Sequence, residues 1–158
     1  MMKRNIIAIC ILLVFVGAYL YSNNFFRKEP IQITPSIRPG RPSAINPDVY
    51  PVSFLLDNKY RLKSVKVVLK AEAETNKYPR PVWHMVSDSA SRSTKMIVYG
   101  MPIPGMKPAV PKTKPEPLQP NVPYRLIIEA EGGYKGYVDF KTVATTQTTP
   151  AATAPQTQ

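Results

Sequence analysis

The sequence predicts an all-β fold, a small β-sandwich preceded by one N-terminal transmembrane helix. Three observations predict it. Short runs rich in β-branched and aromatic residues, each closed by a turn signal, recur between residues 48 and 143. The 158 residues include 18 prolines, which argue against a large helical fold because proline breaks helices. One uncharged, apolar segment lies near the N-terminus.

The N-terminal part is expected to engage a membrane. Residues 1–5 are basic, and residues 6–26 are uncharged and comparable in length to the roughly 20 apolar residues that cross a bilayer. We favour a retained single-pass anchor, with a cytoplasmic N-terminus beside Lys3 and Arg4 and with the domain outside the cytoplasm. The alternative is a signal peptide, whose cleavage releases a periplasmic or secreted protein. The only cysteine, Cys10, lies in this segment, so no disulfide is expected in the exported part.

Residues 27–47 are expected to form a proline-rich stalk between the membrane and the domain. Six prolines lie between Glu29 and Pro51, and a segment of this composition is extended and semi-rigid. The β-sandwich domain is expected at residues 48–143. Residues 144–158 contain only Thr, Gln, Ala and Pro, which bury too little apolar surface to fold, so we expect a disordered tail.

The expected strands follow one another without a convincing helix between them. A turn signal at residues 57–59 separates the first two strands, and a phase slip near Ser64 predicts a β-bulge or a strand break. Eight prolines between Pro102 and Pro123 predict a long loop, either ordered or mobile. The expected strands are residues 52–56, 60–69, 82–86, 95–99 and 124–130, and a return strand that begins near Tyr134.

The last two expected strands carry the cleanest period-two alternation in the chain. Gly132 and Gly133 predict a hairpin turn between them. Six or seven short strands of this kind favour two packed sheets. The side chains expected to face the core are Tyr124, Leu126, Ile128 and Ala130 on the first strand and Tyr134, Gly136, Val138 and Phe140 on the second.

The block that precedes this hairpin resembles part of a known fold family. Leu118, Pro120 and the strand-opening Tyr124 resemble the tyrosine corner of fibronectin type III and related immunoglobulin-like β-sandwiches. The resemblance implies that the Tyr124 hydroxyl bonds to backbone a few residues upstream while its ring packs in the core, and that Trp83 is buried between the sheets. Other blocks, such as PVWHMVSDS, are similar to those of uncharacterised exported bacterial proteins. Such folds host many functions, so neither resemblance implies an activity. The expected structural residues are Tyr124, Leu118, Trp83, Leu126 and Phe140.

The sequence shows little chemistry that points to catalysis. His84 is the only histidine, and a hydrolase that uses it with Ser87, Asp88 or Ser89 is the least favoured hypothesis, because all of them lie within six positions of one strand and its end. No nucleophile-elbow motif is present. One histidine and one cysteine cannot build a tetrahedral metal site. We therefore expect a protein that is not an enzyme and that has no cofactor and no metal.

A surface for interaction is the more favoured hypothesis. Met101, Ile103 and Met106 lie in the proline-stiffened loop beside Lys107, and Tyr137 lies on the last strand. An apolar loop with a basic rim could dock a partner, although the same residues could instead fold back and close the edge of the sandwich.

The expected function is that of a membrane-tethered, extracytoplasmic β-sandwich module for protein interaction or envelope assembly. Its expected partners are the membrane and another envelope protein. The alternative is a secreted or surface module that binds polysaccharide through tyrosines and lysines. Nucleic acid is not an expected partner. The net charge is +11, but the sequence contains no run of five or more like charges.

Overall fold

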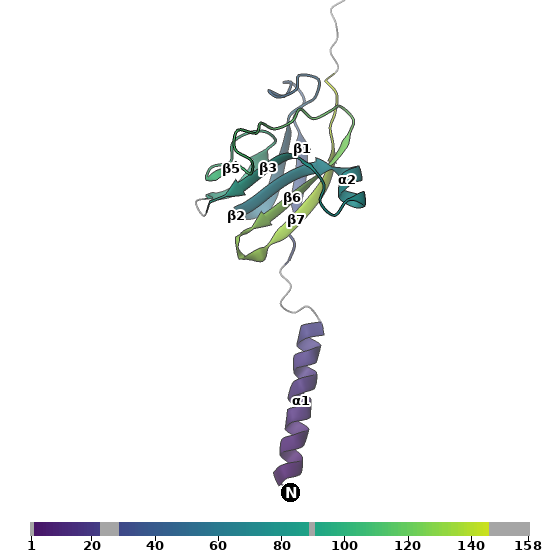
Figure 1. Ribbon diagram of the computed structural model, residues 1–158, viewed down its shortest axis with the longest axis vertical. Helices are drawn as coiled ribbons and strands as arrows, with labels where there is room; N and C mark the ends of the chain where they lie inside the picture. The colour runs from purple at the N-terminus through teal and green to yellow at the C-terminus, as the bar shows by residue number, and fades with distance from the viewer. Residues whose placement is uncertain (1, 23–28, 89–90, 146–158) are drawn as a thin grey trace, which may run out of the picture.

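The computed structural model describes residues 2–22, 29–88 and 91–145 (Figure 1). They form an antiparallel β-structure with few helices, which confirms the predicted all-β class. The elements are α1 (Met2–Ser22), β1 (Ile33–Ile37), β2 (Val52–Leu69), α2 (Lys70–Thr75), β3 (Pro81–Ser87), β4 (Ser93–Val98), β5 (Met106–Pro108), β6 (Pro123–Ala130), the 3-10 turn η1 (Glu131–Gly133) and β7 (Lys135–Lys141).

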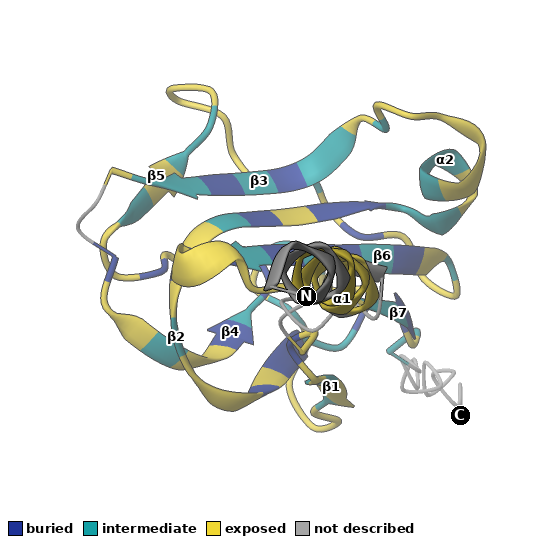
Figure 2. Cartoon of the chain, turned by 90° about the horizontal axis from the view of Figure 1, so that it is seen from below, coloured by how far each residue is buried: buried dark blue, intermediate teal, exposed yellow. Residues whose placement is uncertain are grey.

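The long strand β2 belongs to two groups of hydrogen-bonded strands, called the first and the second ladder. Its first part pairs with β1 and β4, and its second part pairs with β3 and β6. Strands β5 and β7 extend the second ladder to the order β5-β3-β2-β6-β7. In Figure 2, β1 and β4 lie on one side of the molecule and β3 and β5 on the other. A single strand therefore holds both groups of partners together.

The turn predicted at residues 57–59 is wrong, because β2 continues through it. The register of β2 against β4 shifts between Leu55 and Tyr60, so the strand bends there without ending. The Asp57 N–H donates to the Gln32 carbonyl at 3.1 Å, which gives the bend a backbone partner from outside β2. The polar triplet Asp57-Asn58-Lys59 thus marks the place where one strand passes from the first ladder to the second.

The bulge predicted near Ser64 is confirmed. The register of β2 against β6 shifts between Leu62 and Ser64, one residue after the first ladder ends. A bulge adds one unpaired residue and turns the following side chains to the other parity. Leu62 and Val65 are therefore both buried although an odd number of positions separates them.

Aromatic rings from both ladders meet in the core. The ring of Phe54 on β2 meets the ring of Phe140 on β7 edge-on, with centroids 4.9 Å apart, and the Tyr124 ring stacks on Phe140 at 5.8 Å. The expected core residues Trp83 and Leu126 are also buried. Edge-to-face and offset-stacked rings of this kind stabilise a core beyond the area that they bury.

The segment expected to be a stalk contributes to the sheet. Residues 33–37 form β1, where Pro35 is tolerated because an edge strand can lack one donor. Before it, the buried Ile31 donates its N–H to the Lys135 carbonyl at 2.9 Å. Gly136 permits this close approach, since a Cβ there would lie 2.5 Å from the Ile31 carbonyl oxygen. The high proline content of residues 27–47 predicted a stalk where the structure has a strand. The folded domain therefore begins near residue 31 and not at residue 48.

The opposite end of the domain also extends past its predicted limit. Ala144 forms a bridge with Val49, and the Thr145 N–H donates to the Asp48 carbonyl at 2.9 Å. The rest of the expected tail, residues 146–158, lies outside the described residues. The helix α2 and the short strand β5 were not predicted, because α2 has only six residues and β5 only three.

Helix α1 lies apart from the strands (Figure 1). Its side chains from Ile9 to Tyr19 are exposed. In the described part of the chain, no helix combines the length and the apolarity that a membrane crossing requires. The last residues of the segment predicted at 6–26, from Asn23 onward, lie outside the described residues.

The final hairpin follows the predicted alternation except at one position. Strands β6 and β7 pair through η1, and Tyr124, Leu126, Ile128 and Ala130 are all buried. Tyr134 was expected in the core but is 36% exposed, because it lies in the turn before β7 begins. Its ring instead lies beside Tyr60, with centroids 5.8 Å apart.

The hydrogen bond expected of the tyrosine corner is present. The Gln119 N–H donates to the Tyr124 hydroxyl at 3.0 Å, and Leu118 is buried beside it. The Thr142 hydroxyl donates to the Gln119 carbonyl at 2.5 Å. The N–H and the carbonyl of Gln119 are thus both bonded by side chains, one from Tyr124 on β6 and one from Thr142 just after β7. These bonds fix the point at which the proline-rich loop enters β6.

Tyr124→Phe is expected to lower the free energy of unfolding by about 1 kcal/mol, the net value of one hydrogen bond, and by more where the Gln119 N–H stays buried and unpaired. Urea denaturation of the full-length chain, followed by Trp83 fluorescence, measures the change. Tyr137→Phe is the matched control, because its ring is 68% exposed. Identical unfolding curves for Tyr124→Phe and the unmodified chain would contradict the role given to this bond.

Candidate functional site: an apolar pocket beside strand β3

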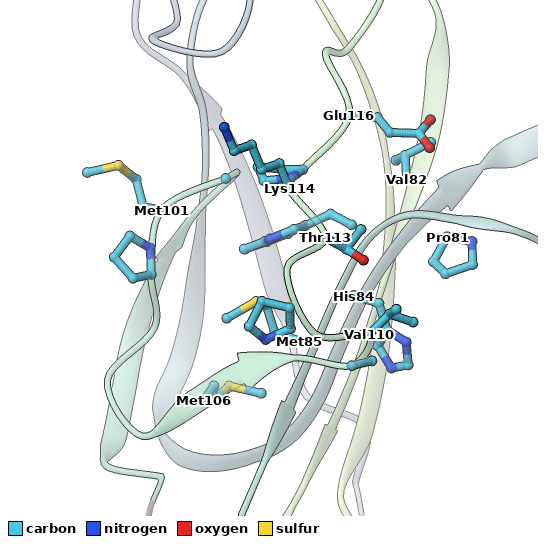
Figure 3. A pocket seen from close by; sticks show the side chains of 16 residues that line it. Pro81, Val82, His84, Met85, Met101, Met106, Val110, Thr113, Lys114 and Glu116 are labelled. Carbon is cyan, nitrogen blue, oxygen red and sulfur yellow. The ribbon is translucent and has the colours of Figure 1, made fainter.

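A pocket of about 320 Å³ opens between β3 and the proline-rich loop that follows β4 (Figure 3). Its floor comes from β3 and its outer wall from residues 100–116. The lining is mainly apolar, with proline rings, methionines and one tryptophan. The lining includes Trp83, His84, Met85, Met101, Met106, Val110, Thr113, Lys114 and Glu116.

Two backbone hydrogen bonds hold the outer wall against β3. The Ala109 N–H donates to the His84 carbonyl, and the Glu116 N–H donates to the Val82 carbonyl, each at 3.0 Å. Residues 110–115 make no such bond to β3 and stand away from it between these two points. The hollow under this stretch is the pocket.

An aromatic pair supports the inner wall, with Trp83 lining the pocket and Tyr99 packed against it. Trp83 and Tyr99 meet edge-to-face with ring centroids 5.2 Å apart, and both are buried. The Tyr99 hydroxyl donates to the Glu116 carbonyl at 2.6 Å. Burial raises the pKa of Tyr99 above its usual value, so the hydroxyl stays protonated and keeps donating. This bond ties the far end of the loop to the core.

Methionines line the pocket from floor to mouth. Met85 on β3 is buried, Met106 on β5 is half-buried, and Met101 is 55% exposed. Val110 adds an exposed apolar side chain on the outer wall, which Figure 3 shows beside His84. Unbranched, polarisable methionine side chains adapt to surfaces of different shape, and they are common in binding surfaces that accept a partner side chain.

The structure separates the residues predicted to form one interaction surface. Met101 and Met106 line the pocket as a group. The prediction that Ile103 belongs to this surface is wrong, because Ile103 is buried in the core. Removing its apolar side chain from water stabilises the fold more than exposing it would. Lys107 forms an ion pair with Asp88. Tyr137 lies on β7, which is separated from β3 by β2 and β6, and is not part of the pocket.

His84 has a neighbour that the sequence did not indicate. Its Nε2 lies 3.3 Å from the Ser64 hydroxyl, because β3 pairs with β2 in a register that places the two side chains on one face. Burial lowers the pKa of His84, and the nearby Lys66 lowers it further. The neutral imidazole is therefore favoured, and its Nε2 either donates to the serine hydroxyl or accepts from it, according to which ring nitrogen carries the hydrogen.

The other residues named for a hydrolase do not gather around His84. The Asp88 carboxylate pairs with Lys107, and the Ser87 hydroxyl lies 3.4 Å from the Gly105 carbonyl, to which it donates. Ser89 lies outside the described residues. Within the described part of the chain, no group of three His, Cys, Asp or Glu side chains could hold a metal ion.

Tyr137 belongs to a charged surface on the second ladder. The Arg125 guanidinium lies over its ring at 5.1 Å and forms two hydrogen bonds to Asp139, at 2.6 and 3.0 Å. Lys70 on α2 lies 3.1 Å from the same carboxylate. The hydrogen bonds from Arg125 and then Lys70 lower the pKa of Asp139 to about 2 although partial burial opposes them. The cluster joins α2 to β6 and β7.

Comparison with known proteins adds no assignment to these surfaces. No protein-family model, no curated protein and no solved structure matches the sequence. The chemistry of the pocket and of the Tyr137 surface is therefore inferred from their own residues.

Asp139→Asn is expected to lower the free energy of unfolding by about 1 kcal/mol at neutral pH, a value reduced for solvent screening because the Asp139 side chain is 33% exposed. The folded-state pKa of Asp139 is depressed from 3.8 to about 2, so its contribution is present above the unfolded value and is lost as the pH falls toward 2. The difference between the two proteins should accordingly shrink between pH 5 and pH 2.

Urea titrations of both proteins at several pH values measure this effect. Glu131→Gln is the control, because Glu131 forms only an exposed pair with Arg61 at 3.9 Å. A stability difference for Asp139→Asn that does not change between pH 5 and pH 2 would contradict the predicted linkage.

Proposed function

We propose that this chain is a membrane-tethered module of the immunoglobulin-like or fibronectin type III-like β-sandwich kind that docks a protein partner outside the cytoplasm. The observation that carries the proposal is the apolar pocket beside β3, with Met101 exposed at its mouth. The proposal includes no catalytic step, cofactor or metal. The partner is another protein of the cell envelope.

The shape and lining of the pocket support docking. Binding pockets are concave and mostly apolar, with volumes of roughly 300–1,000 Å³. This pocket lies at the lower end of that range, which suits one or two anchoring side chains of a partner better than a large ligand. Partner residues that fill such pockets carry much of the binding energy of an interface. Exposed Met101 and Val110 offer further apolar contact around the mouth.

The sandwich part of the proposal is supported by the two ladders of β2 and by the contacts between them. Phe54 and Phe140 join the ladders, Trp83 is buried, and Tyr124 bonds to backbone five residues upstream. The burial of Trp83 and the bond of Tyr124 are what the resemblance to fibronectin type III and immunoglobulin-like sandwiches implied.

The tether is supported by the composition of α1 and by its surroundings. Leu12, Leu13 and Phe15 are each more than half exposed on a helix that carries no acidic residue in its first turn and no basic residue in its last. Apolar surface of this extent calls for an apolar environment. Lys3 and Arg4 before it favour a cytoplasmic N-terminus and an external domain. A cleaved signal peptide, which would release the domain, is the alternative.

A polysaccharide-binding module is the second candidate. Its support is Tyr137, which is exposed on β7 beside Lys135. The Arg125 guanidinium lies over the Tyr137 ring, so a sugar would have to stack on the remaining face or displace the arginine. Loss of glycan binding on Tyr137→Ala would support this candidate over protein docking.

A photo-crosslinking amino acid at position 101 of the full-length chain, expressed in its native membranes, is expected to form one discrete adduct with a partner protein identified by mass spectrometry. Val110→Asp should abolish this adduct, because a carboxylate on the outer wall opposes the entry of an apolar side chain. Tyr78→Asp is the matched control, since Tyr78 is exposed away from the pocket residues. An adduct that persists in Val110→Asp, or its absence from the unmodified chain, would contradict docking at this pocket.

Alkaline carbonate extraction of membranes is expected to leave the full-length chain in the membrane pellet. N-terminal sequencing of the mature protein should then begin at or near Met1, because a retained anchor is not removed. A mature N-terminus after residue 18 and recovery in the soluble fraction would instead establish a cleaved signal peptide and a released domain.

A further inference from the structure

We propose that the pocket beside β3 accepts a partner segment in which an apolar side chain is flanked by carboxylates, with Lys112 and Lys114 as the groups that bind the carboxylates. This inference rests on the proposed docking function and adds the chemistry of the partner. It is carried by the charges at the rim, by the turn that holds one of them, and by the apolar lining beneath.

The acidic side chains near the mouth are already paired within the chain. Glu116 forms an ion pair with Arg80, and Asp88 forms one with Lys107. Among the described residues, no carboxylate lies within ion-pair distance of Lys112 or Lys114. The rim therefore keeps an uncompensated positive charge, in a chain whose net charge is already +11.

The backbone sets Lys112 at the apex of the outer wall. The Thr113 N–H donates to the Val110 carbonyl at 3.2 Å and closes a β-turn with Pro111 at its second position. Lys112 occupies the third position with φ 66°. A positive φ at this position ordinarily selects glycine, because a Cβ is strained there. Lys112 is exposed and does not itself line the pocket, but it is held in this strained conformation between Val110 and Thr113, which do line it. Strain of this kind concentrates where a side chain has a functional role.

The apolar lining of the pocket favours an apolar side chain between the two carboxylates of the partner segment. Trp83, Met85 and Met106 present apolar atoms to the interior, and a charged group buried against them without a partner is strongly disfavoured. A carboxylate is therefore favoured only at the rim, whereas an apolar side chain is favoured inside. Figure 3 shows Lys114 extending from the wall at the top of the pocket, on the same side as Met101. A protein segment meets both demands within a few residues.

The tests use the full-length chain in lipid nanodiscs and three synthetic peptides. One peptide has two leucines between two pairs of glutamates, the second replaces the glutamates by lysines, and the third replaces the leucines by serines. Anisotropy of a labelled peptide reports affinity. Trp83 is the only tryptophan and lines the pocket, so a shift of its emission reports that the pocket itself is filled.

The unmodified chain is expected to bind the leucine–glutamate peptide at least tenfold more tightly than the other two and to shift its Trp83 emission. In the double variant Lys112→Glu, Lys114→Glu, the preference should invert toward the leucine–lysine peptide. The double variant Lys59→Glu, Lys141→Glu is the control, since it changes the net charge equally on strand residues outside the pocket. Lys112→Gly removes one rim charge at a backbone conformation that glycine adopts freely, so its expected several-fold loss of affinity cannot arise from a disrupted turn.

The outcomes separate this inference from the docking function. Equal affinity for the glutamate and lysine peptides, both lost in Val110→Asp, would overturn the acidic partner and leave docking in place. Equal weakening by the two charge-reversal pairs would also overturn it, because the attraction would then be a property of the whole chain. Failure of every peptide would overturn it too, and the crosslink at position 101 then decides whether docking survives.

Discussion

Strand β2 is the element on which the rest of the structure depends, because it hydrogen-bonds to four other strands. The bend at residues 57–59 and the bulge after Leu62 let one strand pair in both ladders. The contact between Phe54 and Phe140 forms only when both ladders are in place. Disruption of β2 would thus remove the pairing of both ladders, including that of β3, which forms the floor of the pocket.

The parts of the fold that were predicted correctly are those whose signal is local. The alternation from Tyr124 to Ala130, the turn at Gly132 and the bulge near Ser64 each depend on a few neighbouring residues. The parts that were missed depend on distant partners. Residues 33–37 form a strand because β2 is available to pair with them, and no property of five residues that include a proline indicates that. The polar triplet in β2 has the composition of a turn, yet distant backbone holds it in a strand.

The candidate site was predicted in outline only. Met101 and Met106 were identified from the composition of the loop, and both line the pocket. Ile103 has the same character and the same neighbours in sequence, but the loop buries it. Trp83 was expected only in the core, and its second role as a pocket wall follows from the position of β3 next to the loop. The tertiary structure decides which apolar residue of a loop points into the core. Neither the periodicity nor the composition of the sequence predicts it.

Proline explains why a pocket forms at this edge. An exposed sheet edge invites pairing, and the loop after β4 covers the edge of β3 as a further strand would. Strand β5 pairs with β3 at residues 106–108, and after it the chain bonds to β3 only through the N–H groups of Ala109 and Glu116. Pro111 and Pro115, which lie between these two residues, have no N–H to donate. Between those two residues the chain must leave the edge and return, and the turn at Pro111 and Lys112 makes this return possible. The donors that proline lacks leave a gap in the pairing, and that gap, lined by apolar side chains, is the pocket at which we propose that a partner docks.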